Sequence, residues 1–240
     1  MKKTVLWALL AAVVLLCGGL VPGQARADEG FSTYVGIASN YIWRGVSRSD
    51  DQVQVFGTVD YLFDSGFYAA ISASNVNLYD DNTYELDFDL GFSGDVGDGF
   101  SYEAGYIYFA YPDAQGTIEG DGEFPDSNVD LDADFGEIYA GIAYGAYSVT
   151  ANIGINNGDD AEWNHGALYL SGDAEFDIAG ELVVVLHAGS YSFDDASDNY
   201  FDCGASVNRN NFTFGIVGTD IDEDDIKVFV SYTIDIDTGF

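Results

Sequence analysis

Segment after segment of this sequence alternates between apolar and polar residues with a period of two. From Tyr84 to Ser93 the even positions are Tyr84, Leu86, Phe88, Leu90 and Phe92, and the odd ones are Glu85, Asp87, Asp89, Gly91 and Ser93. A β-strand turns successive side chains to opposite faces, so this segment predicts a strand with one apolar and one acidic face. No window after residue 27 approaches 18 consecutive apolar residues, which excludes helical membrane spans.

The same alternation predicts twelve strands along the chain. They lie near residues 31–44, 52–63, 67–76, 84–94, 100–111, 135–144, 147–156, 167–177, 182–191, 200–208, 212–219 and 226–236. Short links such as 64–66 and 145–146 alternate with long polar links such as 45–51 and 112–134. An even number of strands joined in this way is the plan of an outer-membrane barrel. The sequence therefore predicts an all-β fold, a single antiparallel up-and-down transmembrane β-barrel of about twelve strands with both termini periplasmic.

The alternation alone does not say which face meets lipid. A soluble barrel of this strand number would have a wide interior that side chains fill with difficulty, whereas lipid outside and water inside avoids that problem. Carboxylates on the polar face could not enter an apolar core without partners. We therefore expect the polar face to line the lumen, with Arg44 opposite the apolar side of Tyr41 and Trp43. The expected pore-lining residues are Arg44, Asp60, Glu85, Asp87, Asp89, Glu103, Glu137, Asp173, Glu175 and Lys227.

Residues 1–27 have the pattern of a cleaved signal peptide. Lys2 and Lys3 precede an unbroken apolar run from Val5 to Cys17, and Ala25-Arg26-Ala27 ends the segment with small residues. The alternative, an N-terminal membrane anchor, would need an apolar run of about 20 residues. Residues 28–240 then form the outer-membrane barrel domain. This mature part keeps one cysteine, Cys203, and therefore forms no intramolecular disulfide.

The charge balance is strongly acidic. The chain has 41 Asp and Glu against 7 Lys and Arg, a formal net charge of −34, which excludes a nucleic-acid partner because phosphate binding needs basic side chains. The four cations after residue 27 are Arg44, Arg48, Arg209 and Lys227. Inward carboxylates would attract cations and repel anions, so we expect a cation-preferring lumen. The alternative is that these carboxylates only solvate a wet wall.

Three segments carry a resemblance to a known family. Residues 39–50 read SNYIWRGVSRSD, and residues 56–77 read FGTVDYLFDSGFYAAISASNVN. Together with YELDFDLGFSGDVGDGFSYEAGYIYFAYP at 84–112, they resemble the TorF family of porin-like bacterial outer-membrane proteins. The resemblance implies a pore. For a passive pore of the outer membrane we expect outer-membrane lipid, lipopolysaccharide and small hydrophilic solutes or cations as partners. The extreme acidity and the acidic insert from Asp113 to Asp134 depart from the family pattern.

An outer-membrane hydrolase is the alternative from the enzyme class. Such an enzyme needs a nucleophile, a histidine and an orienting group within reach of one another. The only histidines are His165 and His187, and neither accompanies a nucleophile elbow, a zinc motif or a phosphate loop. We expect no catalytic residue, no enzyme activity and no cofactor.

The acidic links at 130–134 and 220–225 raise the question of calcium. An EF-hand loop that begins at Asp130 would need glycine at 135 and glutamate at 141, where the chain has Phe135 and Gly141. We therefore expect no metal site.

The remaining alternative is a barrel that conducts nothing, because the loop 113–134 or inward aromatics such as Tyr139 and Tyr169 fill it.

Overall fold

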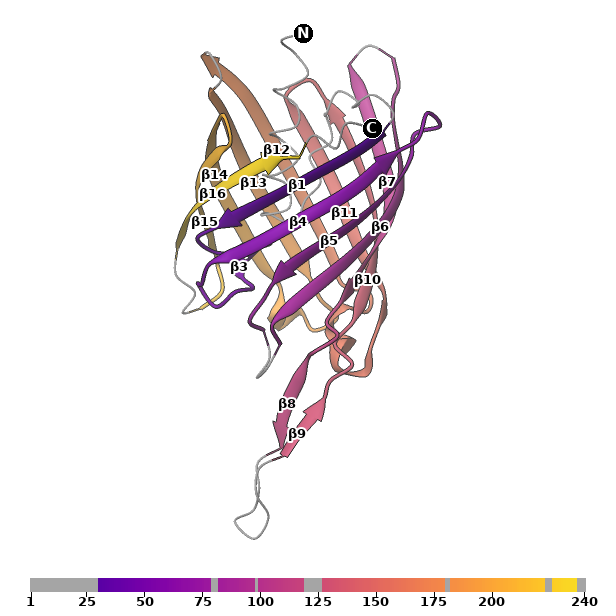
Figure 1. Cartoon of the computed structure of the whole chain (residues 1–240), viewed down its shortest axis with the longest axis vertical. Helices are drawn as coiled ribbons and strands as arrows, with labels where there is room; N and C mark the ends of the chain where they lie inside the picture. The colour runs from indigo at the N-terminus through magenta and orange to yellow at the C-terminus, as the bar shows by residue number, and fades with distance from the viewer. Residues whose placement is uncertain are drawn as a thin grey trace.

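Twelve strands form one closed antiparallel barrel in the computed structural model (Figure 1). The structure describes residues 30–78, 82–97, 99–118, 127–179, 182–222 and 226–236, so the predicted signal peptide lies outside the described residues. Neighbours in the barrel follow chain order, and β1 pairs with both β4 and β16 to close the sheet. The barrel strands are β1 (Gly30–Ala38), β4 (Gln54–Leu62), β5 (Phe67–Asn75), β6 (Tyr84–Asp95), β7 (Phe100–Ala110), β10 (Phe135–Tyr144), β11 (Tyr147–Asn157), β12 (Leu168–Ala179), β13 (Leu182–Ser192), β14 (Tyr200–Arg209), β15 (Phe212–Thr219) and β16 (Lys227–Asp235).

The predicted barrel is confirmed strand by strand, with one exception at the start. Every strand after the first begins and ends within two residues of its predicted limits. These limits were predictable because turn residues such as Asp64-Ser65-Gly66 interrupt the alternation, and Gly66 has a φ of 84°, which favours glycine. The first strand is shorter than predicted and ends at Ala38.

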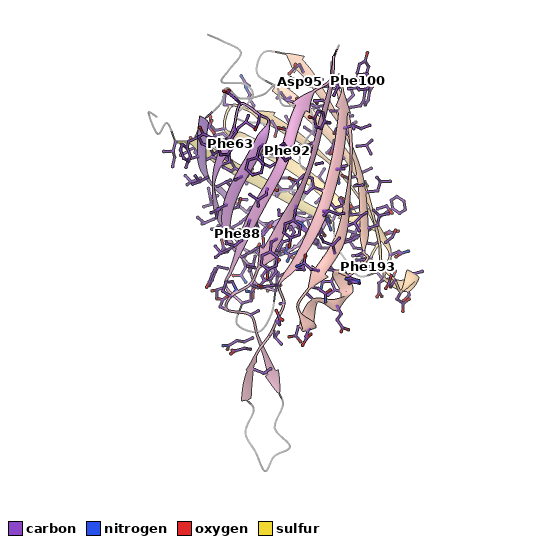
Figure 2. All side chains as sticks on the ribbon, turned by 90° about the vertical axis from the view of Figure 1, so that its right-hand side faces the viewer. Phe63, Phe88, Phe92, Asp95, Phe100 and Phe193 are labelled. Atoms are coloured by element: carbon purple, nitrogen blue, oxygen red, sulfur yellow. The ribbon has the colours of Figure 1, made fainter. Side chains whose placement is uncertain are left out.

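Along β6 the apolar side chains face outward and the carboxylates face inward, which is the reverse of a soluble barrel. On β6, Phe88 and Leu90 are 41% and 50% exposed, whereas Glu85, Asp87 and Asp89 are buried. Figure 2 shows Phe88 and Phe92 on this strand at successive heights along the barrel wall. An apolar outer band around a polar interior is the arrangement that a bilayer requires of a barrel.

Aromatic rings gather at the rim that carries the short turns, where β1 begins and β16 ends. Phe63 contacts Phe67, and Phe100 contacts Tyr144, with ring centroids 5.4 Å and 4.4 Å apart. Figure 2 shows Phe63 and Phe100 near this rim. The exposed aromatics at these strand ends are Phe31, Phe63, Phe92, Phe100, Tyr102, Tyr144, Tyr147 and Phe212. Such a girdle is typical of the level at which a barrel meets lipid headgroups.

The predicted first strand, 31–44, is wrong beyond Ala38. Residues 39–53, called the inserted segment below, leave the barrel wall and form a small hairpin of β2 (Ile42–Trp43) and β3 (Val46–Ser47). Arg44 has a φ of 50° and Gly45 a φ of 84°, so the chain reverses between the two strands. Tyr41 and Trp43 are both buried instead of facing lipid. Arg44 therefore reaches the interior from this hairpin and not from the wall.

The long link 111–134 carries two short strands that extend away from the barrel. Its strands β8 (Gln115–Ile118) and β9 (Ser127–Asp130) pair with each other and project beyond the rim opposite to the short turns (Figure 1). The paired strands β8 and β9 therefore do not occupy the lumen, whereas Tyr111, Ala114 and Ala133 at the base of the link belong to the buried cluster around Tyr41 and Trp43. The helical elements are short 3-10 turns, η1 (Asp159–Asn164) and η2 (Ala196–Asp198). Across the described ranges, no helix has the length and apolar character needed to cross a membrane.

Candidate functional site

The inserted segment crosses the interior of the barrel at the long-loop end. On one side of the hairpin, Ile42 packs into a buried cluster. On the other side, Tyr41 and Trp43 belong to a second buried cluster. The first cluster contains Tyr34, Ala38, Phe56, Val217 and Phe229, and the second contains Phe109, Tyr111, Phe135, Tyr169, Tyr191 and Tyr200. Both faces of the hairpin are therefore covered by protein, and the barrel is packed at this level.

Polar side chains within the inserted segment fix the shape of the hairpin. Asn40 accepts hydrogen bonds from the hydroxyls of Ser47 at 2.7 Å and Ser49 at 3.1 Å, and donates to Asp51 at 2.6 Å. The backbone amide of Tyr41 donates to the Ser49 hydroxyl at 2.9 Å. Because these bonds satisfy buried polar groups locally, the hairpin can enter the barrel without leaving them unpaired.

Arg44 forms the first of two ion pairs between the inserted segment and the wall. Its two terminal nitrogens donate to the two carboxylate oxygens of Glu137 on β10, at 2.9 Å and 2.5 Å. The side chains of Arg44 and Glu137 are each only 1% exposed. The guanidinium carbon lies 4.1 Å, 4.4 Å and 4.6 Å from the ring centres of Trp43, Tyr169 and Tyr191. Planar pairing and aromatic stacking together form a site fitted to a guanidinium group.

Arg48 forms the second ion pair, four residues further along the same segment. Its Nη2 lies 3.3 Å from Glu85 Oε2 and donates to the Tyr111 hydroxyl. Glu85 also accepts from the hydroxyl of Tyr41 at 2.7 Å and from that of Tyr111. The Arg48 guanidinium carbon lies 4.6 Å from the Trp43 ring centre, so the indole contacts both guanidinium groups of the segment. Glu85 is fully buried, and these partners compensate its charge.

The wall around Arg44 is shaped by a bulge and by a glycine. The pairing of β10 with β11 shifts register between Gly136 and Glu137, and such bulges re-aim side chains. On β13, Gly189 lies beneath Tyr169, because a Cβ at Gly189 would be 2.2 Å from the Tyr169 hydroxyl oxygen. A side chain at position 189 would therefore displace the Tyr169 ring that faces Arg44.

His187 belongs to a network of the wall and has no nucleophile arrangement around it among the residues that the structure describes. Its Nδ1 lies 2.7 Å from Asp173 Oδ1 and its Nε2 lies 2.9 Å from Asp202 Oδ1. The hydroxyl within reach is that of Tyr169, 3.0 Å from Nε2, which also donates to Asp202. Both ring nitrogens are thus engaged with carboxylates, an arrangement that holds Tyr169 in place. His165 is exposed in the turn after η1.

The other expected pore-lining residues lie on the interior face at several heights. Asp89 accepts a 2.7 Å hydrogen bond from Tyr139, whose hydroxyl also contacts that of Tyr68. Asp87 Oδ1 and Glu103 Oε1 are buried without a hydrogen-bond partner among the described residues. Those on the interior parity of their strands, partly exposed, are Asp60, Glu103, Asp173, Glu175 and Lys227. Whether they line a water-filled passage stays a prediction.

Sequence reasoning missed the role of the inserted segment. Arg48, Tyr41 and Trp43 were not among the expected interior residues, although all three meet in this site. One signal was present, since two of the four cations after residue 27 lie within five positions of each other, close to aromatic residues. Cations concentrated in one segment of a very acidic chain indicate that this segment contacts buried carboxylates.

Solved structures of other proteins are similar to this barrel. The KdgM porin is 8% identical with a TM-score of 0.50, and the match covers 85% of this chain and 98% of that chain. A structure from a study of the in-meso crystallization of membrane proteins is 11% identical with a TM-score of 0.53, and covers 87% and 85% of the two chains. The NanC porin is 10% identical with a TM-score of 0.47, over 86% and 98%. At these identities the first two similarities show a common fold.

The sequence itself matches one family. No curated protein matches the chain. The matching family model does not carry the TorF name, so the resemblance of residues 39–112 to that family stays a prediction. The family model spans residues 23–237, nearly the whole chain. The chain therefore belongs to Gcw_chp, a family described as bacterial proteins of unknown function.

Proposed function

We propose that this chain is a porin-like passive diffusion channel of the bacterial outer membrane, with an acidic lumen that prefers cations. The observation that carries the proposal is the orientation of the closed barrel, whose apolar side chains face out and whose carboxylates face in. The likeness of its fold to the KdgM porin supports the same class of protein. The resemblance of residues 39–112 to the TorF family agrees with it.

The cation preference rests on the inward carboxylates away from the inserted segment. Glu85 and Glu137 are paired with arginines, so they contribute little negative charge to a passing solute. Further carboxylates face the interior and belong to neither of these two ion pairs, namely Asp60, Asp87, Asp89, Glu103 and Glu175. A lumen lined by charges of one sign concentrates the oppositely charged ion, so this stretch would select for cations.

Location and partners follow from the same proposal. Residues 1–27 would direct export and be removed, and the outer band of exposed apolar side chains would contact lipid. The acidic long loops would face outward, where divalent ions could bridge them to lipopolysaccharide. Small hydrophilic solutes or inorganic cations would move down their gradients, and no chemical step is proposed.

The inserted segment sets a condition on conduction. Its buried contacts on both sides of the hairpin leave the long-loop end packed in this structure. In this proposal, solutes therefore pass when the segment shifts toward the long-loop rim. Besides the two ion pairs, such a shift would break the backbone hydrogen bonds from the Ser39 amide to Val230 and from the Asn77 amide to Arg48.

Planar-bilayer recording of residues 28–240 tests the proposal. We expect ohmic steps and, in a salt gradient, a reversal potential of the sign that cation flow produces. Asp89→Asn combined with Glu103→Gln should reduce this potential, whereas Asp95→Asn at the exposed end of β6 should not. A preference for chloride in the unmodified protein would refute the cation preference.

A barrel that conducts nothing is the second candidate. The packed interior at the inserted segment favours it, because Arg44, Glu137, Tyr169 and Tyr191 are almost inaccessible to solvent. Silence from a demonstrably folded barrel, both before and after removal of the hairpin, would support this structural or surface-interaction role over a channel.

A further inference from the structure

We propose that Glu137, Tyr169 and Tyr191 form a binding site for guanidinium-bearing cations, and that Arg44 occupies it as an internal ligand. A solute with the same group would compete with Arg44 for this site and so release the inserted segment. The proposal rests on the proposed channel function for its biological meaning, because the competing solute would be a permeant. The site itself depends only on the geometry around Arg44.

The three residues belong to the barrel wall and not to the segment. Glu137 lies on β10, Tyr169 on β12 and Tyr191 on β13. Of the three rings that face the Arg44 guanidinium, Trp43 alone comes from the inserted segment. Withdrawal of the segment would therefore leave one carboxylate and two aromatic rings in place on the wall.

Residues outside the inserted segment hold these groups independently of Arg44. Asn152 Nδ2 lies 3.4 Å from Glu137 Oε2, and the Tyr191 hydroxyl contacts both Glu137 and Asn164. Tyr169 is fixed through Asp202 and His187. A site whose carboxylate and rings are already held by their surroundings needs little reorganisation to accept another ligand.

The geometry selects guanidinium over ammonium. Two parallel hydrogen bonds to the Glu137 oxygens require a planar group with two donors on one edge, which an ammonium does not have. Ring centres at 4.4 Å and 4.6 Å from the guanidinium carbon also suit a flat cation. Urea has a similar planar shape but is neutral, so it could not compensate the negative charge of Glu137.

The internal ligand is held in a way that allows exchange. Arg44 is a non-glycine residue with a φ of 50°, a conformation that L-residues adopt rarely and at a cost. Burial of the ion pair also removes both charges from water, which offsets much of their attraction. Departure of Arg44 would leave Glu137 unpaired, and a solute guanidinium would restore that pairing.

The experiment uses residues 28–240 folded in detergent micelles, with Trp163→Phe so that Trp43 is the one tryptophan of the mature chain. Arg44→Gly removes the internal ligand and suits the positive φ at this position. Titration with methylguanidinium should change Trp43 emission saturably in this variant, and urea should not. Unmodified Arg44 should require at least about tenfold more methylguanidinium, because it competes for the same carboxylate.

Three results would overturn the proposal. One is no saturable response in a folded Arg44→Gly barrel, another is an equal response to urea, and the third is a response that survives addition of Glu137→Gln. If Arg44→Gly does not fold, Arg44→Lys replaces it, and methylguanidinium should displace the lysine at a lower concentration than it displaces arginine. Equal concentrations for the two would overturn the proposal as well.

This binding test is separate from conduction. Saturable binding in micelles together with silent bilayers would keep the guanidinium site and reject the channel. Ohmic steps without binding would keep the channel and reject the site.

Discussion

Arg44 and Glu137 lie 93 positions apart, yet they meet in two charge-assisted hydrogen bonds with both side chains almost completely buried. The pair joins the inserted segment to β10. In the order of strands around the barrel, β10 lies almost opposite β1, from which the segment starts. Removal of one partner from a buried ion pair is strongly destabilising, at about 3–5 kcal/mol, because the other charge stays uncompensated. This contact therefore contributes strongly to holding the segment inside the barrel, beside the Arg48–Glu85 pair and the two buried clusters.

Glu137→Gln should loosen the inserted segment without unfolding the barrel. The substitution leaves the Arg44 guanidinium buried with a neutral partner, and we expect the segment to lose about 3 kcal/mol of its docking free energy. Trp43 emission in the Trp163→Phe background should move to longer wavelength, while the far-ultraviolet circular dichroism of the strands stays the same. Asp95→Asn is the matched control, since Asp95 is exposed at the end of β6. An unchanged Trp43 emission in Glu137→Gln would show that the ion pair does not hold the segment.

Gly45→Ala, at the tip of the hairpin, should lower the thermal stability more than Gly145→Ala in a short turn. Gly45 has a φ of 84°, and a Cβ there would lie 2.6 Å from Thr219 Cγ2 and 2.7 Å from Asp202 Cβ. Backbone strain of about 1–2 kcal/mol would add to an overpacking cost of about 1–3 kcal/mol. Gly145→Ala is the control, because Gly145 has a φ of 61° but an added methyl group there would meet nothing within 4 Å. Thermal unfolding followed by Trp43 emission should show the larger loss for Gly45→Ala, and equal losses would mean that the tip has room.

The barrel was predictable because its strands repeat one local rule. Each strand alternates apolar with polar residues and is bounded by turn residues, so β10 and β15 agree with their predicted limits residue for residue. The direction of the faces was also predictable, since Glu85, Asp87 and Asp89 have no place in contact with hydrocarbon. Both conclusions depend only on the order of residues along the chain and on the chemistry of their side chains, which can be read from the sequence.

The inserted segment could not be predicted in the same way. Tyr41 and Trp43 continue the alternation of β1, so a two-residue period extends the first strand to residue 44. A hairpin within the lumen is covered on both of its faces, and therefore Ile42 and Trp43 are both buried although they point in opposite directions. Periodicity shows that a segment has two faces, but it does not show that each face meets protein.

Asp113 should release a contact between two long loops under acidic conditions. Its carboxylate accepts hydrogen bonds from the side chain of Asn82 at 2.9 Å, and from the amide of Thr83 at 3.0 Å and its hydroxyl. Partial burial opposes ionisation, but these hydrogen bonds outweigh it and lower the pKa of Asp113 below its ordinary value of 3.8. A lowered pKa stabilises the loop contact above the ordinary value, and this contribution is lost as the pH falls through the lowered one.

The amide resonance of Thr83 in micelles should therefore titrate with a midpoint below 3.8. Asp113→Asn should abolish that titration, because the side chain no longer ionises. A midpoint at or above the ordinary value in the unmodified protein would contradict the assignment of these hydrogen bonds to the carboxylate form.

Replacement of residues 41–48 by a glycine-serine linker of equal length should open the barrel. The change removes Ile42 and Trp43 from the two buried clusters and takes both arginines away from Glu85 and Glu137. We expect a single-channel conductance several times larger and a stronger preference for cations, because two carboxylates would then face the lumen without guanidinium partners. Removal of residues 115–130, which carry β8 and β9, is the control, and it should leave the conductance unchanged because this hairpin projects away from the barrel (Figure 1). The opposite result, with conduction gained by trimming β8 and β9 and not by replacing the inserted segment, would place the obstruction in the long link after all. If none of the folded variants conducts, the interior is closed over a longer stretch than the inserted segment occupies.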